Sequence, residues 1–279
     1  MGSGDLVACL KRRTPLRHLV PALLLVLLVS SGGSALDHEE LANVLKSMPP
    51  NGPLWRYGNV VMRSTTKKAG MAPVLFVHWS HRTRYTCRVC HMELGFSMKQ
   101  GGTGITRNQY LAGNFCGACH NGEVAFSVKD GPQPQCKRCH LEDTRALQKA
   151  FDEFAQELPF ATFGNGIDWS AALKEGMVSP VNSIGTDPPI KLAAKLKQPL
   201  KLGTSSPRSD VDFSHQDHYE ELDCSNCHPD IFNIKKKSTE DFTMDSNIYG
   251  NFCGACHMKV AFPMNDCKRC HKSMSSQQY

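Results

Sequence analysis

Hydrophobic residues recur at helical spacing in one long stretch of the chain. They are Leu147, Ala150, Phe151, Phe154, Ala155 and Leu158. Intervals of three and four residues predict an amphipathic helix, and Pro159 ends it. A shorter helix is predicted over 169–176, with Gly176 as its stop signal.

Elsewhere the hydrophobic pattern is weak. Residues 36–75 predict a short helix near 39–46, followed by irregular chain rich in Pro and Gly. Repeated Pro and Gly between Gly176 and Pro207 predict an extended linker on the surface. The expected fold class is mainly α with much irregular coil.

The N-terminal residues have the pattern of a secretory leader. A basic segment containing Lys11, Arg12, Arg13 and Arg17 precedes an almost wholly apolar run from Leu19 to Val29, and small residues end at Ala35. This predicts a signal peptide over 1–35 with cleavage after Ala35. The alternative, a membrane anchor, needs about 20 apolar residues, and this run is shorter. We therefore expect a periplasmic protein, or one at the outer surface, with no membrane span after cleavage.

Composition adds little to this picture. Hydrophobic residues make up 41% of the chain and charged residues 21%, which is ordinary for a soluble protein. Without the leader, 28 basic residues face 25 acidic ones. So small an excess implies no nucleic-acid partner.

The cysteines carry the chemical signal. One of the 13, Cys9, leaves with the leader, and the other twelve form pairs separated by two residues, each pair followed by His. The segments are Cys87-Arg-Val-Cys90-His91, Cys116-Gly-Ala-Cys119-His120, Cys136-Lys-Arg-Cys139-His140, Cys224-Ser-Asn-Cys227-His228, Cys253-Gly-Ala-Cys256-His257 and Cys267-Lys-Arg-Cys270-His271. Cysteines in such a pattern have several known uses. Twelve cysteines in an exported chain can form six disulfides, and paired cysteines also bind zinc or act as redox dithiols.

The His after every pair favours a fourth chemistry, covalent haem attachment. Two thiols form thioethers with the vinyl groups on one porphyrin edge, and the adjoining imidazole binds the iron. Six covalently bound haem c groups are therefore predicted, with the twelve cysteines as attachment sites and His91, His120, His140, His228, His257 and His271 as proximal ligands.

The second half of the chain repeats the first at an offset of 137 residues. Phe76, His78 and His81 correspond to Phe213, His215 and His218, and the six motifs divide into three and three. The segment from Gly113 to His120 recurs letter for letter from Gly250 to His257.

Each repeat resembles the triheme cytochromes of the c7 type, a branch of the class III multihaem cytochromes c. The resemblance covers 76–141 and 213–272. It implies two small triheme domains built around stacked haems, with His78, His81, His215 and His218 as distal ligands of the first two haems of each domain. Spacing agrees independently, because His at i and i+3 share one helical face.

The third haem of each repeat lacks an obvious distal ligand. Outside the leader, only His38 is unassigned. Some members of the family use Met from the segment between the first and second motifs. The second repeat has Met244 there; the first has Arg107 at the matching position but contains Met98. We predict His271/Met244 and His140/Met98 ligation, against the alternative that both Met fill hydrophobic gaps.

The expected domains are 1–35 signal peptide, 36–75 lead-in, 76–141 first triheme domain, 142–212 helical and Pro/Gly connector, and 213–279 second triheme domain. The expected function is electron transfer between redox protein partners, from a quinol-linked donor to a terminal reductase or an outer-membrane conduit, including extracellular metal reduction. Oligomeric state stays open. One alternative is an oxidoreductase of the nitrite or hydroxylamine type, which needs an open iron. Another is a haem-filament subunit in which His38 reaches a neighbouring chain.

Overall fold

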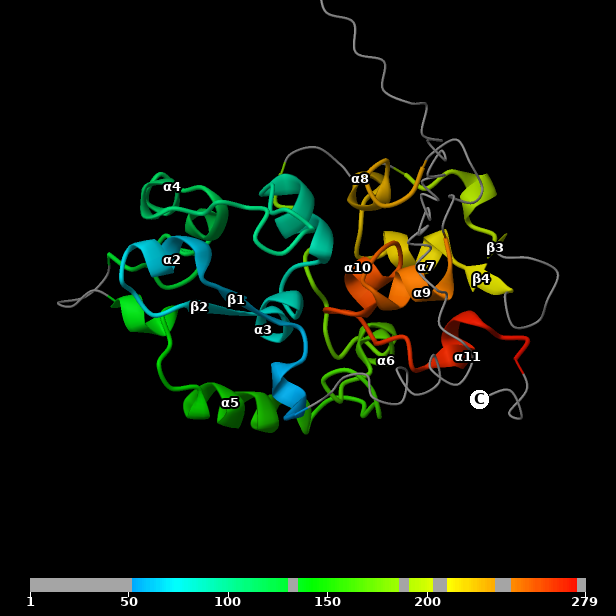
Figure 1. Cartoon of the computed structure of the whole chain (residues 1–279), viewed down its shortest axis with the longest axis horizontal. Coiled ribbons are helices and arrows are strands. Elements are labelled where there is room, and N and C mark those ends of the chain that lie inside the picture. Colours follow the sequence, from blue (N-terminus) through cyan, green and yellow to red (C-terminus); the bar gives the residue numbers. More distant parts are fainter. Residues whose placement is uncertain (1–51, 130–134, 186–190, 203–209, 234–241, 275–279) are drawn as a thin grey trace, which may run out of the picture. The chain divides into compact units, whose positions relative to one another are not determined.

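The computed structural model describes residues 52–129, 135–185, 191–202, 210–233 and 242–274 (Figure 1). Short helices and irregular chain dominate this part, so the predicted fold class is confirmed. The helical elements are η1 (Leu54–Arg56), α2 (Ser64–Lys68), α3 (His78–Arg82), η2 (Val89–Glu93), α4 (Arg107–Leu111), η3 (Phe115–Ala118), η4 (Gln135–Arg138), α5 (Arg145–Ala155), α6 (Trp169–Lys174), η5 (Ala194–Leu196), α7 (His215–Tyr219), α8 (Cys224–Cys227), α9 (Met244–Ile248), α10 (Gly254–His257) and α11 (Cys267–Cys270).

Three predictions concern residues outside these ranges. The leader over 1–35, the short helix near 39–46 and His38 all precede residue 52, where the description begins. Among the described residues, no helix has both the length and the hydrophobicity that a bilayer crossing requires.

A two-stranded antiparallel sheet precedes the first pair of upstream histidines. β1 (Asn59–Met62) pairs with β2 (Val74–Val77) so that Asn59 faces Val77 and Met62 faces Val74 (Figure 1). Val, Leu and Phe suit such strands because their side chains pack on a pleated surface. The prediction of irregular chain before residue 75 is therefore wrong for 54–75. Four-residue strands are too short to show a clear alternation in the sequence.

A second small sheet stands at the start of the second repeat. β3 (Leu200–Leu202) pairs antiparallel with β4 (Val211–Phe213), with Leu200 opposite Phe213. The expectation of a plain linker up to Pro207 is therefore wrong at β3, whose residues form half of this sheet. In both repeats a strand ends next to a helix that carries two histidines, since α3 follows β2 directly and one residue, Ser214, separates β4 from α7.

The predicted amphipathic helix is α5, and it packs on a compact aromatic core. Phe151 is 2% exposed and lies among Trp55, Trp79, Val77 and Ile167. The ring centroids of Trp79 and Phe151 are 5.4 Å apart in an edge-to-face arrangement, a geometry that aromatic pairs favour. Because Trp79 belongs to α3, this core anchors the helix that carries His78 and His81.

Both predicted helices of the connector are confirmed. α5 ends at Ala155, a few residues before Pro159. α6 begins after Asp168, whose side chain accepts a hydrogen bond from the Ala171 amide, a standard N-cap. Gly176 follows α6 with a φ of 70°, which fits its expected role as a stop signal.

The aromatic core generates a stability prediction. Phe151→Ala removes a side chain that is almost fully buried, so the free energy of unfolding should fall by about 3–5 kcal/mol. Chemical denaturation followed by far-ultraviolet circular dichroism measures this. Phe160→Ala is the matched control, because Phe160 is 74% exposed and its loss should change the free energy by less than about 0.5 kcal/mol. Equal effects of the two substitutions would contradict the assigned core.

Candidate haem-binding sites

The four upstream histidines lie on α3 and α7, with nearly the same geometry in each repeat. The Phe76 ring centroid lies 4.7 Å from that of His78 at 88° and 4.5 Å from that of His81 at 33°. The Phe213 centroid lies 4.8 Å from His215 at 87° and 4.6 Å from His218 at 32°. The duplicated sequence therefore builds a duplicated arrangement of one phenylalanine and two imidazoles.

The Cys-x-x-Cys-His motifs form helical turns. In five of them the amide of the final His donates to the carbonyl of the first Cys at 2.8–2.9 Å. Such a turn places the two cysteines, three residues apart, on one side beside the imidazole. These five turns end at His120, His140, His228, His257 and His271. The first motif instead leads into the π-helical turn η2.

Among the described residues, no disulfide joins any of the twelve cysteines of the six motifs. The structure thus gives no support to the disulfide alternative. Among the described residues, no group of three or more His, Cys, Asp or Glu side chains is arranged to hold a bare metal ion. Burial raises the pKa of the Cys87 thiol to about 12, with a smaller contribution from the Glu221 carboxylate, and Arg82 opposes the shift.

Nine of the ten described histidines share one contact, a hydrogen bond from Nδ1 to a backbone carbonyl. Because a carbonyl oxygen only accepts, Nδ1 carries the proton and Nε2 keeps a free lone pair. The bonds are 2.6–3.1 Å long and join His78 to Gly58, His81 to Val77, His91 to Phe96, His120 to Phe126, His140 to Ala72, His218 to Ser214, His228 to Phe232, His257 to Phe262 and His271 to Asp210. Metal-binding histidines are held in this way, with the second ring nitrogen fixed by a carbonyl or carboxylate.

Sequence reasoning missed these carbonyl acceptors. A signal was present for four of them, since a Phe follows each first and second motif at a distance of four to six residues: Phe96, Phe126, Phe232 and Phe262. The third motif of each repeat uses a residue just before a strand instead, Ala72 before β2 and Asp210 before β4. The tenth histidine, His215, has a buried Nδ1 with no partner among the described residues.

The upstream histidines lie close to motif histidines. The ring centroids of His81 and His120 are 6.3 Å apart, and those of His218 and His257 are 6.2 Å apart. Two imidazole nitrogens at about 2 Å on opposite sides of one metal ion place the ring centroids roughly 6 Å apart. Each pair thus has the separation that two axial ligands of one iron need.

Burial keeps these imidazoles in the neutral form that binds metal. It lowers the pKa of His78 to about 4, although the bond to Gly58 opposes the shift, and the nearby His91 adds to the lowering. Burial also lowers the pKa of His257 to about 4. Burial lowers the pKa of His215 too, with a contribution from His228. The histidine of the first motif thus contributes to lowering the pKa of the first upstream histidine in each repeat, and the second upstream histidine lies beside the histidine of the second motif.

Two segments of the chain, residues 74–141 and 211–272, each match the family model described as cytochrome c7 and related cytochrome c. The chain is a multihaem cytochrome c with two c7-type domains. The matches begin at Val74 and Val211, the first residues of β2 and β4. They include all six motifs, so binding of haem c is a property of both c7-type domains.

Solved structures of related cytochromes resemble the chain. One is a c7-type three-haem cytochrome domain, with 35% identity over 30% of this chain and 91% of that domain, at a TM-score of 0.26. The C-terminal hexahaem fragment of GSU1996 has 26% identity over 77% of this chain and 96% of the fragment, at 0.25. The dodecahaem cytochrome c GSU1996 has 24% identity over 79% and 73%, at 0.25. A search of the curated proteins finds no match.

The exact repeat around the second motif of each c7-type domain has a steric cause. A Cβ added to Gly117 would lie 2.0 Å from the Tyr110 carbonyl oxygen, and one added to Gly254 would lie 1.7 Å from the Asn247 oxygen. Both distances are far below contact, so only Gly allows the motif to approach the preceding helix, α4 or α9.

Each of these motifs is also preceded by a residue in the left-handed region. Phe115 has a φ of 53° and Phe252 a φ of 47°, a conformation that is strained for a large side chain. The surrounding packing must hold both residues in it. The left-handed phenylalanine and the close approach of Gly117 and Gly254 recur at equivalent positions of the two domains.

The predicted methionine ligands are placed as follows. Met244 is the first residue of α9, which contacts α10 of the fifth motif. The Met98 sulfur accepts a hydrogen bond from the side chain of Asn226, a residue of the fourth motif, at 3.9 Å. His140, the proposed partner of Met98, instead lies against Ala72 and Val74. The Met98 contact does not support the His140/Met98 pair, and both methionine assignments stay predictions.

Gly117 and Gly254 generate the next prediction. Gly117→Ala and Gly254→Ala should each lower the free energy of unfolding by at least about 1–3 kcal/mol, because the new methyl group would overlap a backbone carbonyl. Denaturation of the purified haem-loaded proteins measures the change. Gly104→Ala is the control, since nothing lies within 4 Å of a Cβ at that position. A wild-type midpoint for Gly117→Ala or Gly254→Ala would contradict the assigned contact.

Proposed function

We propose that this chain is an exported hexahaem cytochrome that carries electrons and does not convert a substrate. The observation that carries the proposal is the pairing of imidazoles, His81 with His120 and His218 with His257, at the spacing of two axial ligands. An iron with two protein ligands has no position left for a substrate. Its available chemistry is the gain and loss of one electron.

The proposal assigns six haems, each on one motif. The two thiols of the motif attach the porphyrin and the motif histidine binds the iron. His78, His81, His215 and His218 complete the first two sites of each domain, in the order of their proximity to the motifs. Met244 and Met98 are proposed for the third sites, because the other assignments already use every histidine among the described residues.

The protein orients these ligands through its backbone. A carbonyl that accepts from Nδ1 fixes the ring plane and makes the opposite nitrogen a stronger donor. Stronger donation favours ferric iron and lowers the reduction potential, whereas a thioether raises it. The domains would thus contain low-potential sites with two imidazoles and one higher-potential site each.

We propose a location in the periplasm or at the outer surface, because the leader predicted over residues 1–35 would direct the chain to export. The electron donor would be linked to quinol oxidation, and the acceptor would be a terminal reductase or an outer-membrane conduit. Such a conduit would pass the electrons on to extracellular metal. The surface of a carrier must bring a haem edge near each partner. In domains with about 20 residues per haem, little protein is available to cover those edges.

The haem count is tested by mass. The intact protein should exceed its polypeptide mass by six haems, at roughly 0.6 kDa each. Mass spectrometry under denaturing conditions keeps covalent haem and removes any bound zinc, and thiol titration should find no free cysteine in the six motifs. A mass excess below six haems together with reactive thiols would contradict the assignment.

The distal histidines are tested by carbon monoxide. His78→Ala and His215→Ala should each open one iron, raise its potential and create one carbon monoxide site per chain, while the wild type takes up none at stoichiometric level. Visible spectra of the dithionite-reduced proteins report the binding. Gln216→Ala, on α7 beside His215, is the matched control and should behave as the wild type. Tight stoichiometric binding by the wild type would instead favour the oxidoreductase alternative.

The proposed role of Met244 is tested by a redox titration. Met244→Ala should shift the highest-potential step of a redox titration or make that step sensitive to carbon monoxide, because the third site of the second domain loses its thioether. Met71→Ala is the control, since Met71 is 44% exposed and lies in the lead-in. Wild-type protein with six indistinguishable bis-imidazole spectra would show that the methionine assignments are wrong.

A further inference from the structure

The two c7-type domains differ in charge at one matching segment. Residues 82–88, Arg-Thr-Arg-Tyr-Thr-Cys-Arg, contain three basic residues and no acidic one. The equivalent residues 219–225, Tyr-Glu-Glu-Leu-Asp-Cys-Ser, contain three acidic residues and no basic one. We call these the basic strip and the acidic strip. Arg84 and Glu221 even occupy the same position of the repeat, with opposite charge.

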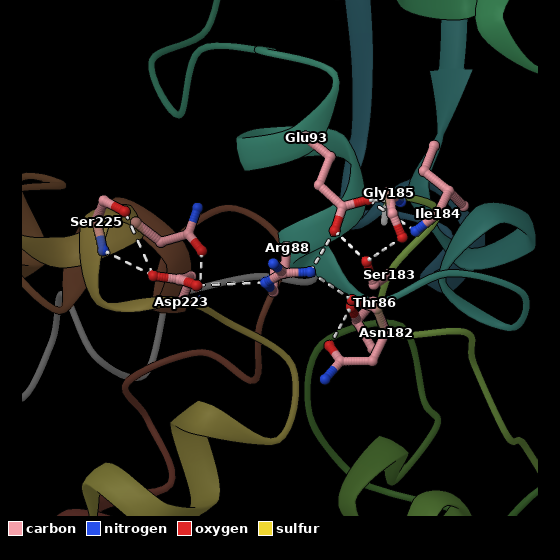
Figure 2. A network of polar contacts seen from close by, with 10 residues as sticks. Thr86, Arg88, Glu93, Asn182, Ser183, Ile184, Gly185, Asp223 and Ser225 are labelled. Carbon is pink, nitrogen blue, oxygen red and sulfur yellow. Dashed lines mark hydrogen bonds and ion pairs between the residues drawn. The ribbon is translucent and has the colours of Figure 1, made fainter. Parts of the chain in front are cut away.

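The two strips contact each other in the structure. The Arg82 guanidinium lies 3.1 Å from the Glu221 carboxylate, and Arg88 Nε donates to Asp223 Oδ2 at 3.3 Å. The Arg88 amide also donates to the Glu221 carbonyl at 2.9 Å. Figure 2 shows Arg88 between Asp223 on one side and Glu93 with Asn182 on the other.

The central pair is buried and has further partners. The side chains of Arg88 and Asp223 are 10% and 7% exposed. Arg88 Nη1 also donates to the Glu93 carboxylate and, at 2.9 Å, to the Asn182 carbonyl. Glu93 in turn accepts from Ser183 Oγ at 2.7 Å. Charges this deeply buried are stable only as a complete set, so removal of one member leaves a strongly unfavourable unpaired charge.

Neither domain contains both halves of this pair. At the position equivalent to Arg88 the second domain has Ser225, and at the position equivalent to Asp223 the first domain has Thr86. Asp223 also caps α8, where its side chain accepts from the Ser225 amide at 3.4 Å. The acidic partner is therefore held rigidly at the N-terminus of the fourth motif.

We propose that the basic strip and the acidic strip form a docking interface that holds the second c7-type domain against the first in one orientation. The partner of each surface is the other domain of this chain. Because each domain has only one of the two charged surfaces, two copies of the same domain would not fit together through it. Opposite charge at equivalent positions thus selects the pairing of first domain with second.

The interface lies at two haem attachment motifs. Cys87 Sγ is 3.6 Å from Glu221 Oε2, and η2 of the first motif contacts α8 of the fourth. The Met98 sulfur meets Asn226 of α8 at 3.9 Å. If the haem assignments of the proposed function hold, the haem on Cys87 and Cys90 lies at the junction of the two domains.

A double-mutant cycle on the full haem-loaded chain tests the interface. Arg88→Gln removes the buried cation, and Asp223→Asn removes the anion but keeps an oxygen that can cap α8. Hydrogen exchange of the residue 88 amide is the readout, because that amide donates to Glu221 across the interface. Each single variant should raise its exchange rate about tenfold or more, and the double variant should raise it by less than the product of the two.

Arg84→Gln is the matched control. It removes the same charge from the same strip, but Arg84 is exposed, so exchange at residue 88 should stay at the wild-type rate. Unchanged exchange in both single variants, an effect of Arg84→Gln equal to that of Arg88→Gln, or strictly multiplicative effects in the double variant would each overturn the proposal. Haem content is measured by mass on every variant, so failure of the haem assignments would appear there and not in the exchange rates.

Discussion

The placement of the histidine side chains depends on one interaction, the hydrogen bond from an imidazole Nδ1 to a backbone carbonyl. A haem-binding domain of about 60 residues has little apolar material of its own, so it cannot fix ligand side chains by packing alone. Nine histidines are fixed instead by a main-chain oxygen. Each such bond settles the tautomer and the ring plane together, and leaves Nε2 free to bind iron. The small sheets serve this purpose, because β2 and β4 bring both upstream histidines and the acceptors of the third motifs to one place.

The two domains share the geometry of the upstream histidines but differ in the contacts that hold the helix carrying them. Phe76 and Phe213 contact their histidines at distances that agree within 0.1 Å. The helix α3, however, is anchored by Trp79 in an aromatic core, whereas the equivalent residue of α7 is Gln216. The second domain also forms ion pairs with the first domain and with the connector. Its acidic strip pairs with arginines of the first domain, and Arg269 pairs with Asp168 of the connector at 2.9 Å.

Sequence reasoning succeeded where the determining contacts are local. The helical turns of the motifs, the two connector helices and the placement of two histidines on each of α3 and α7 all depend on residues three or four apart. β1 and β3 were not predicted, because strands of three or four residues are too short to show an alternation of hydrophobic and polar residues. Sequence reasoning also missed the carbonyl acceptors, because every residue has a carbonyl and no side chain marks the one that is used. The clash that requires Gly117 likewise depends on the path of another segment.

By itself, the sequence determined the chemistry of the chain: six Cys-x-x-Cys-His motifs, two upstream histidines per repeat and the duplication that groups them in threes. These are covalent facts about residue type and spacing, and they do not depend on how the chain folds. Only the tertiary structure decided which backbone carbonyls fix the histidines. His140 finds its carbonyl at Ala72, 68 residues away, and His271 finds its own at Asp210, 61 residues away. The opposite charges of the two strips are visible in the sequence, but their contact required the fold, because ion pairing between distant segments depends on which surfaces the chain brings together.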